Sequence, residues 1–397
     1  MHLSSLSLEQ FRSYTALSLE IPPQGLRVIG PNASGKSTLL ESVLLLATLK
    51  GARSANEREL VCRGSGEEFG LPPFARVGGT VITRQEQLEL QIALQVDPET
   101  RSARKTVSVD GVSKRVLDAV GLLKVVSFSP EDVSLLAGPP AQRRRYLDVM
   151  LSQVDRRYLR ALSRYVRVLS QRNGLLRALS RDRASPNAPA TLSQLAFWDD
   201  EVIAAGATVI AHRLLAVSNI DGLANARFGQ IAEGSLSATY RSNVVTDGMH
   251  RYAIGTNADD LGLVVAREWT QQLASVRAEE IRRGLSLLGP QRDDFSLAID
   301  DMDVGVYGSR GQQRLSVVAL KLAEADLMRR EAMEPPTVLL DDVFSELDGE
   351  RAEHLIGTLS ALGCQLIVTA TERERLSTSS LSALPWFQTR AVVREPA

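Results

Sequence analysis

The sequence predicts an α/β fold that is interrupted by a long, mostly helical segment. Short apolar runs typical of buried strands lie near both ends of the chain, at 26–29 and 337–341. From about residue 142 the apolar spacing changes to that of long helices. We therefore expect one α/β domain split over residues 1–140 and 285–397, with a helical arm inserted over residues 141–284.

The first 120 residues are expected to form a mixed sheet. Apolar and polar residues alternate through several short segments, as in half-buried strands. Asp110-Gly111 is a typical hairpin turn at the end of this region. The predicted strands are residues 3–8, 17–21, 26–29, 77–83, 88–96 and 106–110.

The inserted arm begins with a helix that carries an apolar stripe. Leu159, Leu162, Val166 and Leu169 recur at helical spacing, so they are predicted to face the core. A loop is predicted at 185–189, where two prolines interrupt the pattern. Further helices are predicted over 191–217 and 262–283, with a strand at 235–240. The last part of the chain is predicted to form strands at 295–299, 337–341 and 365–369 and a helix at 312–331.

Composition excludes several classes of protein. The net charge of −1 gives no overall field that would attract nucleic acid, so any basic surface must be local. Cys62 and Cys364 are far apart and form no C-x-x-C pair, which fits a reducing compartment. No apolar run approaches the roughly 18 residues that span a bilayer, and the start of the chain does not resemble a signal peptide. We expect a cytoplasmic protein with no membrane segment.

The segment from Gly30 to Thr38 matches the phosphate-binding pattern G-x-x-x-x-G-K-[ST]. A predicted strand precedes it and a predicted helix follows, so backbone N–H groups and a helix N-terminus would converge on a polyphosphate. Lys36 would reach the β- and γ-phosphates, and the Ser37 hydroxyl would hold Mg²⁺. The predicted nucleotide-binding residues are Gly30, Pro31, Asn32, Ala33, Ser34, Gly35, Lys36, Ser37 and Thr38.

Two carboxylates follow the apolar run near the end of the chain. Asp341 stands where such a site holds Mg²⁺, and Asp342 stands where an attacking water would be polarised. By itself the pattern also fits a buried strand that ends in a solvated acidic turn. Together with the phosphate loop, it favours a catalytic site with Asp342 as the catalytic residue and with Ser37 and Asp341 as metal ligands.

Ser309-Arg310-Gly311-Gln312-Gln313 opens a predicted helix and forms a second candidate anion site. It resembles the signature motif of ATP-binding-cassette ATPases, which meets the γ-phosphate bound to the other subunit. Residues 345–348 resemble the D-loop of the same superfamily. The resemblance implies an ATP-binding-cassette head in which Ser309, Gly311 and Gln312 complete the site of a second copy.

The distance in sequence between Lys36 and Ser309 is much larger than in a transporter ATPase subunit. Heads of the SMC type carry long coiled coils at this place, but the insertion here has no sustained heptads. Helices of 20 to 40 residues would make an arm only about 30–60 Å long. A short-armed head of this kind is similar to the RecF family.

The resemblance to the RecF family extends over most of the chain. Segments 8–14, 128–132 and 288–294 are similar to family blocks, with Gln291 where the family usually has His. It implies an α/β SMC/RecF-like head with a helical arm, binding ATP and Mg²⁺, dimerising with ATP and acting in DNA repair and replication. It also implies contact with single-stranded, gapped or duplex DNA, the partners RecR and RecO, and help in loading RecA. Asp342 replaces the usual catalytic Glu of the superfamily, so a slow, weak, DNA-stimulated ATPase is expected.

The arm also offers a candidate DNA surface. Residues 143–183 contain twelve arginines and three acids, a local charge of +9. Arg156, Arg160, Arg164 and Arg167 share one predicted helix face, and Tyr158 and Tyr165 lie among them. Clustered arginines suit the phosphates of a nucleic-acid backbone. The alternative is a solvated arm helix whose arginines pair with acids of the head, since the rest of the chain carries a net charge of −10.

Three alternative functions differ in what they require. A transporter ATPase subunit would need a membrane partner and a much shorter insertion. A nuclease-type ATPase of the overcoming-lysogenization-defect class would need an acidic metal-binding domain after the head, and about 50 residues follow Asp341. A DNA-binding protein that binds ATP without hydrolysing it would fail a single-turnover hydrolysis assay.

Overall fold

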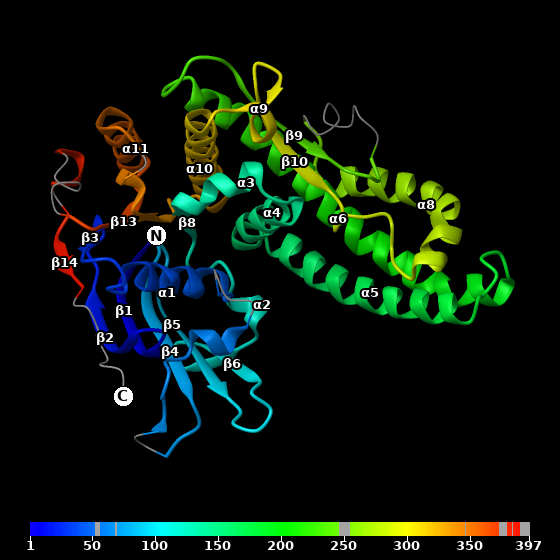
Figure 1. Ribbon diagram of the computed structural model, residues 1–397, viewed down its shortest axis with the longest axis horizontal. Helices are drawn as coiled ribbons and strands as arrows, with labels where there is room; N and C mark the ends of the chain where they lie inside the picture. The colour runs from blue at the N-terminus through cyan, green and yellow to red at the C-terminus, as the bar shows by residue number, and fades with distance from the viewer. Residues whose placement is uncertain are drawn as a thin grey trace. The chain divides into compact units, whose positions relative to one another are not determined.

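The computed structural model describes residues 1–51, 56–67, 70–245, 255–345, 347–372, 379–382 and 384–389 (Figure 1). The chain forms two compact units. The first consists of Met1–Asp132 and Lys321–Ala397, and the second of Val133–Leu320.

The first unit contains an antiparallel sheet of six strands. Among its strands, the one at Gln87–Val96 most clearly shows the alternation of buried and exposed residues that is expected when one face packs on a core. In spatial order they are β2 (Tyr14–Glu20), β1 (His2–Phe11), β4 (Phe74–Ile82), β5 (Gln87–Val96), β6 (Ala103–Val109) and β7 (Val112–Lys114).

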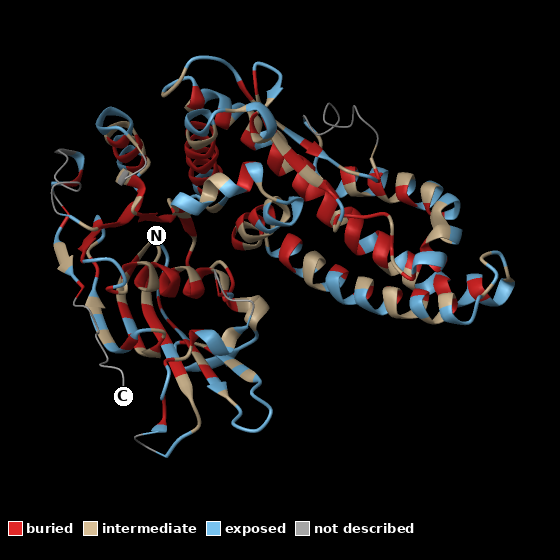
Figure 2. Ribbon diagram, in the orientation of Figure 1, coloured by how far each residue is buried: buried red, intermediate tan, exposed pale blue. Residues whose placement is uncertain are grey.

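The same unit contains a second, wholly parallel sheet of five strands. Three of them, β3, β12 and β13, are buried along their whole length (Figure 2). In spatial order the strands are β14 (Trp386–Gln388), β3 (Gly25–Ile29), β13 (Gln365–Ala370), β12 (Thr337–Asp341) and β8 (Val125–Phe128). Its members therefore come from both ends of the chain.

The expected mixed sheet over the first 120 residues is wrong. β3 does not pair with the strands that precede and follow it in the sequence. It pairs in parallel with β13, where Gly25 lies opposite Leu366. The physical reason is that every residue of β3 is buried, as is typical of a strand in a parallel sheet that is covered on both faces. Helix α1 (Lys36–Thr48) contacts strands of both sheets, which explains why apolar residues surround it.

Gln365 ties the two sheets together. Its side-chain Oε1 accepts from the Leu3 backbone N at 2.9 Å, and its Nε2 donates to the Leu3 and Pro22 carbonyls at 2.8 and 2.9 Å. Gln365 is 1% exposed.

The other described helices of this unit are α2 (Val116–Ala119), α11 (Gly349–Ala361) and the later part of α10 (Arg310–Ala332). Its described 3₁₀ turns are η1 (Glu57–Leu60), η3 (Pro130–Val133), η4 (Val343–Ser345) and η6 (Ser379–Leu381).

The second unit is mostly helical and carries one small sheet. Its helices are α3 (Ser134–Ala137), α4 (Pro140–Val154), α5 (Arg156–Arg181), α6 (Pro189–Phe228), α8 (Ala258–Arg283), α9 (Val304–Tyr307) and the start of α10. Its sheet has the order β11 (Met302–Asp303), β10 (Asp294–Ile299), β9 (Leu236–Arg241).

This unit extends past both predicted limits of the insertion, 141 and 284. On the late side, β10 pairs antiparallel with β9, so residues after 284 join the helical unit. On the early side, helix α3 contacts α4 and α9 of the same unit. Pairing between segments more than 50 residues apart leaves no local signal in the sequence, so the predicted limits are narrower than the second unit.

Helix α6 forms the centre of the second unit. It contacts α4, α5, α8 and β9, and nearly half of its residues are buried (Figure 2). Among the described residues it is the one helix that could cross a membrane by length and composition alone. However, 72% of its most apolar 18-residue window is buried within the protein, as in the core helix of a soluble fold.

The apolar stripe predicted for α5 is only partly buried, since Leu159 is buried, Leu162 and Leu169 are half-buried, and Val166 is exposed. Val166 is 59% exposed, whereas Tyr158 and Tyr165 are 0% and 2% exposed. The buried face of α5 is formed by Tyr158, Leu159, Tyr165, Val168, Arg172, Leu176 and Leu179. The predicted stripe contains aliphatic residues alone, whereas the buried face also contains two tyrosines. Their hydroxyl groups are hydrogen-bonded to Asp148 and Gln291.

Candidate functional site

The phosphate loop joins β3 to α1 through a backbone that only certain residues tolerate. Ala33 and Gly35 have positive φ, at 63° and 95°, and α1 begins directly after at Lys36. A Cβ on Gly30 would lie 2.1 Å from Thr389 Oγ1 and 2.5 Å from Ser34 Oγ. The glycine at position 30 is therefore required by close packing as well as by the motif.

Two hydroxyl groups from distant segments hold this loop. Thr389 and Ser34 share a hydrogen bond of 2.6 Å between their hydroxyl oxygens, and Thr389 N donates to Ile29 O at 2.8 Å. Tyr14 donates its hydroxyl to Gly35 O at 3.2 Å. Burial raises the pKa of Tyr14 to about 12, so this hydroxyl stays protonated. The loop is thus shaped in advance by β2 and by the segment after β14.

The Lys36 ammonium is folded back onto the loop. Its Nζ donates to Gly30 O at 2.7 Å and to Pro31 O at 2.9 Å, and the residue is 8% exposed. Burial lowers the pKa of Lys36, while the carboxylates of Asp342 and Asp341 act in the opposite direction. A polyphosphate could replace the two carbonyls as the partner of this cation.

Asp341 and Ser37 meet at the carboxyl ends of the parallel strands. Ser37 Oγ donates to Asp341 Oδ1 at 3.1 Å. Thr369, on the intervening strand β13, donates to the same oxygen at 2.9 Å. A hydroxyl beside a carboxylate is the oxygen ligand pair that Mg²⁺ takes in phosphate-binding sites. Ligand sites of open α/β sheets lie at this edge.

Asp342 follows in a left-handed backbone conformation, with φ of 51°. Its N–H donates to Thr369 Oγ1 at 3.1 Å, so the threonine touches both acidic residues. Such a backbone is strained for a residue other than glycine and is common at functional sites.

Ser309 and Gln312 form a local structure in the second unit. Gln312 N donates to Ser309 Oγ at 3.2 Å, and Ser309 N donates to Gln312 Oε1 at 2.9 Å. This is a reciprocal capping box at the start of α10. A Cβ on Gly311 would meet only Ser309 Oγ, at 3.9 Å, so the backbone there is open to approach. Of the D-loop-like segment, Asp348 caps α11 and Glu346 lies outside the described residues.

The candidate DNA residues of α5 are all exposed, but they differ in their partners. Arg164 is held by Glu201 through contacts of 2.7 to 3.0 Å. Within the described part of the chain, Arg156, Arg160 and Arg167 have no ion pair, so their guanidinium groups face solvent. The predicted role of Tyr158 and Tyr165 on this surface is wrong, because both side chains are buried.

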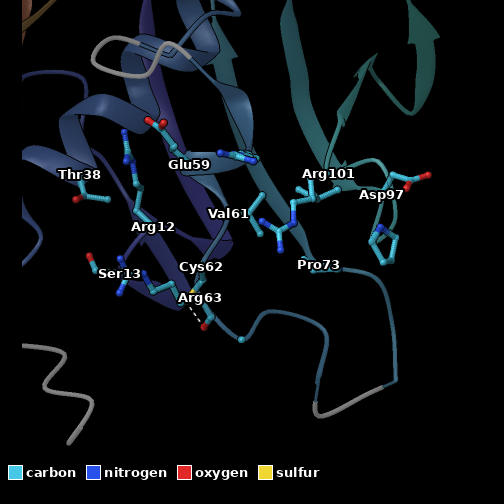
Figure 3. A pocket seen from close by; sticks show the side chains of 14 residues that line it. Arg12, Ser13, Thr38, Glu59, Val61, Cys62, Arg63, Pro73, Asp97 and Arg101 are labelled. Atoms are coloured by element: carbon cyan, nitrogen blue, oxygen red, sulfur yellow. Dashed lines mark hydrogen bonds between the residues drawn. The ribbon is translucent and has the colours of Figure 1, made fainter. Parts of the chain in front are cut away.

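A cavity of about 1100 Å³ opens beside the phosphate loop at Thr38 (Figure 3). Arg12 and Ser13 line it next to Thr38, and Arg58, Arg63 and Arg101 line it further away. Arg12 also forms a bidentate pair with Glu41 of α1, at 2.9 and 3.1 Å.

Sequence reasoning missed Thr369 and Thr389 as parts of this site. Thr369 ends an apolar run, which is a weak signal of a strand end at a ligand edge. Thr389 is 355 positions from Ser34, and nothing near it in sequence points to the loop.

Known proteins resemble this chain in sequence and in fold. The family described as RecF/RecN/SMC N terminal domain matches residues 2–388. The chain is 42% identical to the DNA replication and repair protein RecF of Thermomicrobium roseum, over 98% of both chains. It is 41% identical to the protein of the same name from Herpetosiphon aurantiacus, over 97% of both.

Two solved structures share the fold. One is the recombination mediator protein RecF-ATPrS in the RecFOR pathway, with a TM-score of 0.82 and 26% identity over 98% of this chain and 96% of that one. The other is RecF-ATP of the same pathway, with a TM-score of 0.80 and 26% identity over 94% and 92%. The expected α/β head of the SMC/RecF type is confirmed.

Proposed function

The chain belongs to the RecF family, and from this premise we propose that it is an ATP-dependent DNA-binding protein of DNA replication and recombinational repair. The observation that carries the proposal is the hydrogen bond between Ser37 and Asp341, which lie 304 positions apart. It joins the phosphate loop to the acidic strand end, as a nucleotide site with a metal requires.

In this proposal the residues from Gly30 to Thr38 hold the phosphates of ATP. Lys36 exchanges the carbonyls of Gly30 and Pro31 for phosphate oxygens. Ser37 and Asp341 hold Mg²⁺, which neutralises phosphate charge when bound. The nucleoside extends past Thr38 into the cavity lined by Arg12 and Ser13.

Asp342 is proposed to orient the attacking water and to accept its proton. Its side chain is one methylene shorter than the glutamate that is usual at this position of the superfamily. Hydrolysis is therefore slow, and DNA is proposed to stimulate it. A slow ATPase suits a clamp that opens after hydrolysis.

Ser309, Gly311 and Gln312 are proposed to complete the site of a second copy. These residues are exposed at the start of α10, where an anion is favoured, and the capping bonds of Ser309 N and Gln312 N would give way to the phosphate. ATP would thereby join two heads around DNA, and hydrolysis would separate them. The proposed partners are RecR and RecO, and the proposed outcome is the loading of RecA onto DNA. The proposed location of the protein is the cytoplasm.

The test is the mass of the protein with and without ATP, measured by light scattering. The unaltered protein should dimerise with ATP. Lys36→Ala should lose ATP binding and the dimer, because the phosphates lose their buried cation. Ser309→Arg should keep ATP binding but stay monomeric, because a large cation blocks approach of a second copy.

Ser193→Arg is the matched control, since Ser193 is an exposed serine of the same unit. It should dimerise normally. An ATP-induced dimer of Ser309→Arg at normal affinity would contradict the role in a second copy. An absence of single-turnover hydrolysis by the unaltered protein would favour the alternative that ATP is bound but not cleaved.

A further inference from the structure

A second pocket lies in the first unit, at the edge of the parallel sheet opposite the nucleotide site. It has a volume of about 450 Å³, and its main lining residues are Arg84, Arg329, Arg330, Met333, Pro335 and Leu362. Pro335 comes two positions before β12 begins, and Leu362 comes three positions before β13 begins. The pocket is thus at the amino ends of these strands, whereas Asp341 ends β12.

The rim of this pocket carries three exposed arginines. Arg84 comes from the turn between β4 and β5, and Arg329 and Arg330 from the last turn of α10. Within the described residues, none of the three guanidinium groups has a hydrogen bond or an ion pair, and the lining contains no acid. Three unpaired cations around one cavity favour an anionic occupant.

The rest of the lining carries no charged side chain. Pro335 and Leu362 contribute to it, and Met333 is 71% exposed beside them. Met333 has a φ of 57°, a left-handed conformation in which a glycine is usual after a helix. The large side chain of Met333 is therefore exposed on a strained backbone. A methionine side chain is flexible and adapts readily to apolar partners.

The pocket is also fixed in position. The Arg84 backbone N donates to Glu334 Oε1 at 2.9 Å, which ties the β4–β5 turn to the segment after α10. Glu334 is 9% exposed, so this link is largely shielded from water. A preformed site loses little entropy when it binds a partner.

We propose that this arginine-rimmed pocket binds an acidic peptide segment of a partner protein, with one apolar side chain inserted between the arginines. Carboxylates pair with the guanidinium groups, and the inserted side chain covers Met333 and Leu362. The sugar-phosphate backbone of a duplex would pair with the arginines, but its bases stay stacked inside and leave the apolar part of the lining uncovered. A single strand, which has free bases, is a separate arm of the test below. Because the pocket lies at the other edge of the sheet, it can be filled while ATP is bound.

The test uses fluorescence anisotropy with the full chain and a short fluorescein-labelled peptide in which one phenylalanine is flanked by glutamates. The unaltered protein should bind it. The double variant Arg329→Glu with Arg330→Glu should weaken binding about tenfold or more, and so should Arg84→Glu from a separate element. Replacing the peptide's glutamates by glutamine, or its phenylalanine by alanine, should each weaken binding.

Arg104→Glu is the matched control, because Arg104 is an exposed arginine of the same unit outside the pocket. It should bind the peptide normally, and so should Lys36→Ala, which separates this site from the nucleotide site. All three arginines are exposed, so the variants should fold. The proposal is overturned if the unaltered protein ignores the peptide or if the double variant binds it equally well. It is also overturned if a single-stranded oligonucleotide occupies these arginines in its place.

Discussion

At the scale of single residues, the nucleotide site depends on contacts that the motif pattern does not contain. Gly30 is packed against Thr389 and Ser34 so closely that any Cβ would overlap both hydroxyl groups. Thr369 similarly touches Asp341 and Asp342 from the strand between them and the loop. Both threonines act as positioning residues for groups that would contact the nucleotide.

Gly30→Ala is expected to weaken ATP binding by about tenfold or more, the equivalent of roughly 1.4 kcal/mol. The added methyl group must displace Thr389 or the loop, and either movement misaligns the N–H groups that would face phosphate. Titration with a fluorescent ATP analogue measures the effect.

Gly357→Ala provides the control. A Cβ at Gly357 meets nothing within 4 Å, and the residue lies inside α11. This change should leave ATP affinity unchanged and stabilise the helix slightly. Unchanged affinity in Gly30→Ala would mean that the loop adapts and that Thr389 does not fix its shape.

At the scale of elements, α5 separates its charged residues into two classes. Arg172 is 1% exposed and binds Asp199 and Glu280 at 2.8 and 2.7 Å, so it belongs to the core of the second unit. Arg156 and Arg160 face solvent. The high arginine content of the arm therefore serves both internal pairing and an exposed surface, and only the exposed part is proposed to contact DNA.

The triple variant Arg156→Gln, Arg160→Gln and Arg167→Gln is expected to flatten the salt dependence of DNA binding. Each phosphate contact that is lost should lower the slope of log K against log salt by about 0.7 to 0.9. Binding of labelled single-stranded and duplex DNA is measured over a series of salt concentrations.

Arg164→Gln is the control on the same helix, because its guanidinium is already paired with Glu201. Arg164→Gln should change the slope of log K against log salt less than the replacement of Arg156, Arg160 or Arg167 by glutamine. An unchanged slope in the triple variant would move the DNA surface to another part of the protein.

At the scale of the whole molecule, the first unit is assembled from both ends of the chain. β3 and β8 come from the first part, and β12, β13 and β14 come from the last part. Gln365 then links this parallel sheet to β1 of the antiparallel sheet through Leu3. The nucleotide site can form only after these distant segments have paired.

Gln365→Leu should destabilise the first unit by about 2–5 kcal/mol. The new side chain has a similar size, but the buried N–H and C=O of Leu3 and the C=O of Pro22 lose their partner. Unfolding in urea measures the change.

Gln91→Leu tests whether the effect comes from burial, because Gln91 is exposed on β5. It should alter stability by no more than about 0.5 kcal/mol. A similar stability for both variants would show that the link between the sheets contributes little.

The sequence by itself determined the features that are local. The phosphate loop, the acidic strand end at Asp341, the long helices of the arm and most strands could be predicted, because each depends on residues that are neighbours in the chain. The capping start of α10 at Ser309 belongs to the same class.

Only the tertiary structure decided which distant segments meet. It assigned β3 to the parallel sheet, brought Thr389 to Ser34, buried Tyr158 and Tyr165, and paired Arg164 with Glu201. The physical reason is that the residues of a buried strand, or those beside a tyrosine, do not indicate which distant segment will contact it. Its partner is selected by packing and hydrogen bonding across the whole fold.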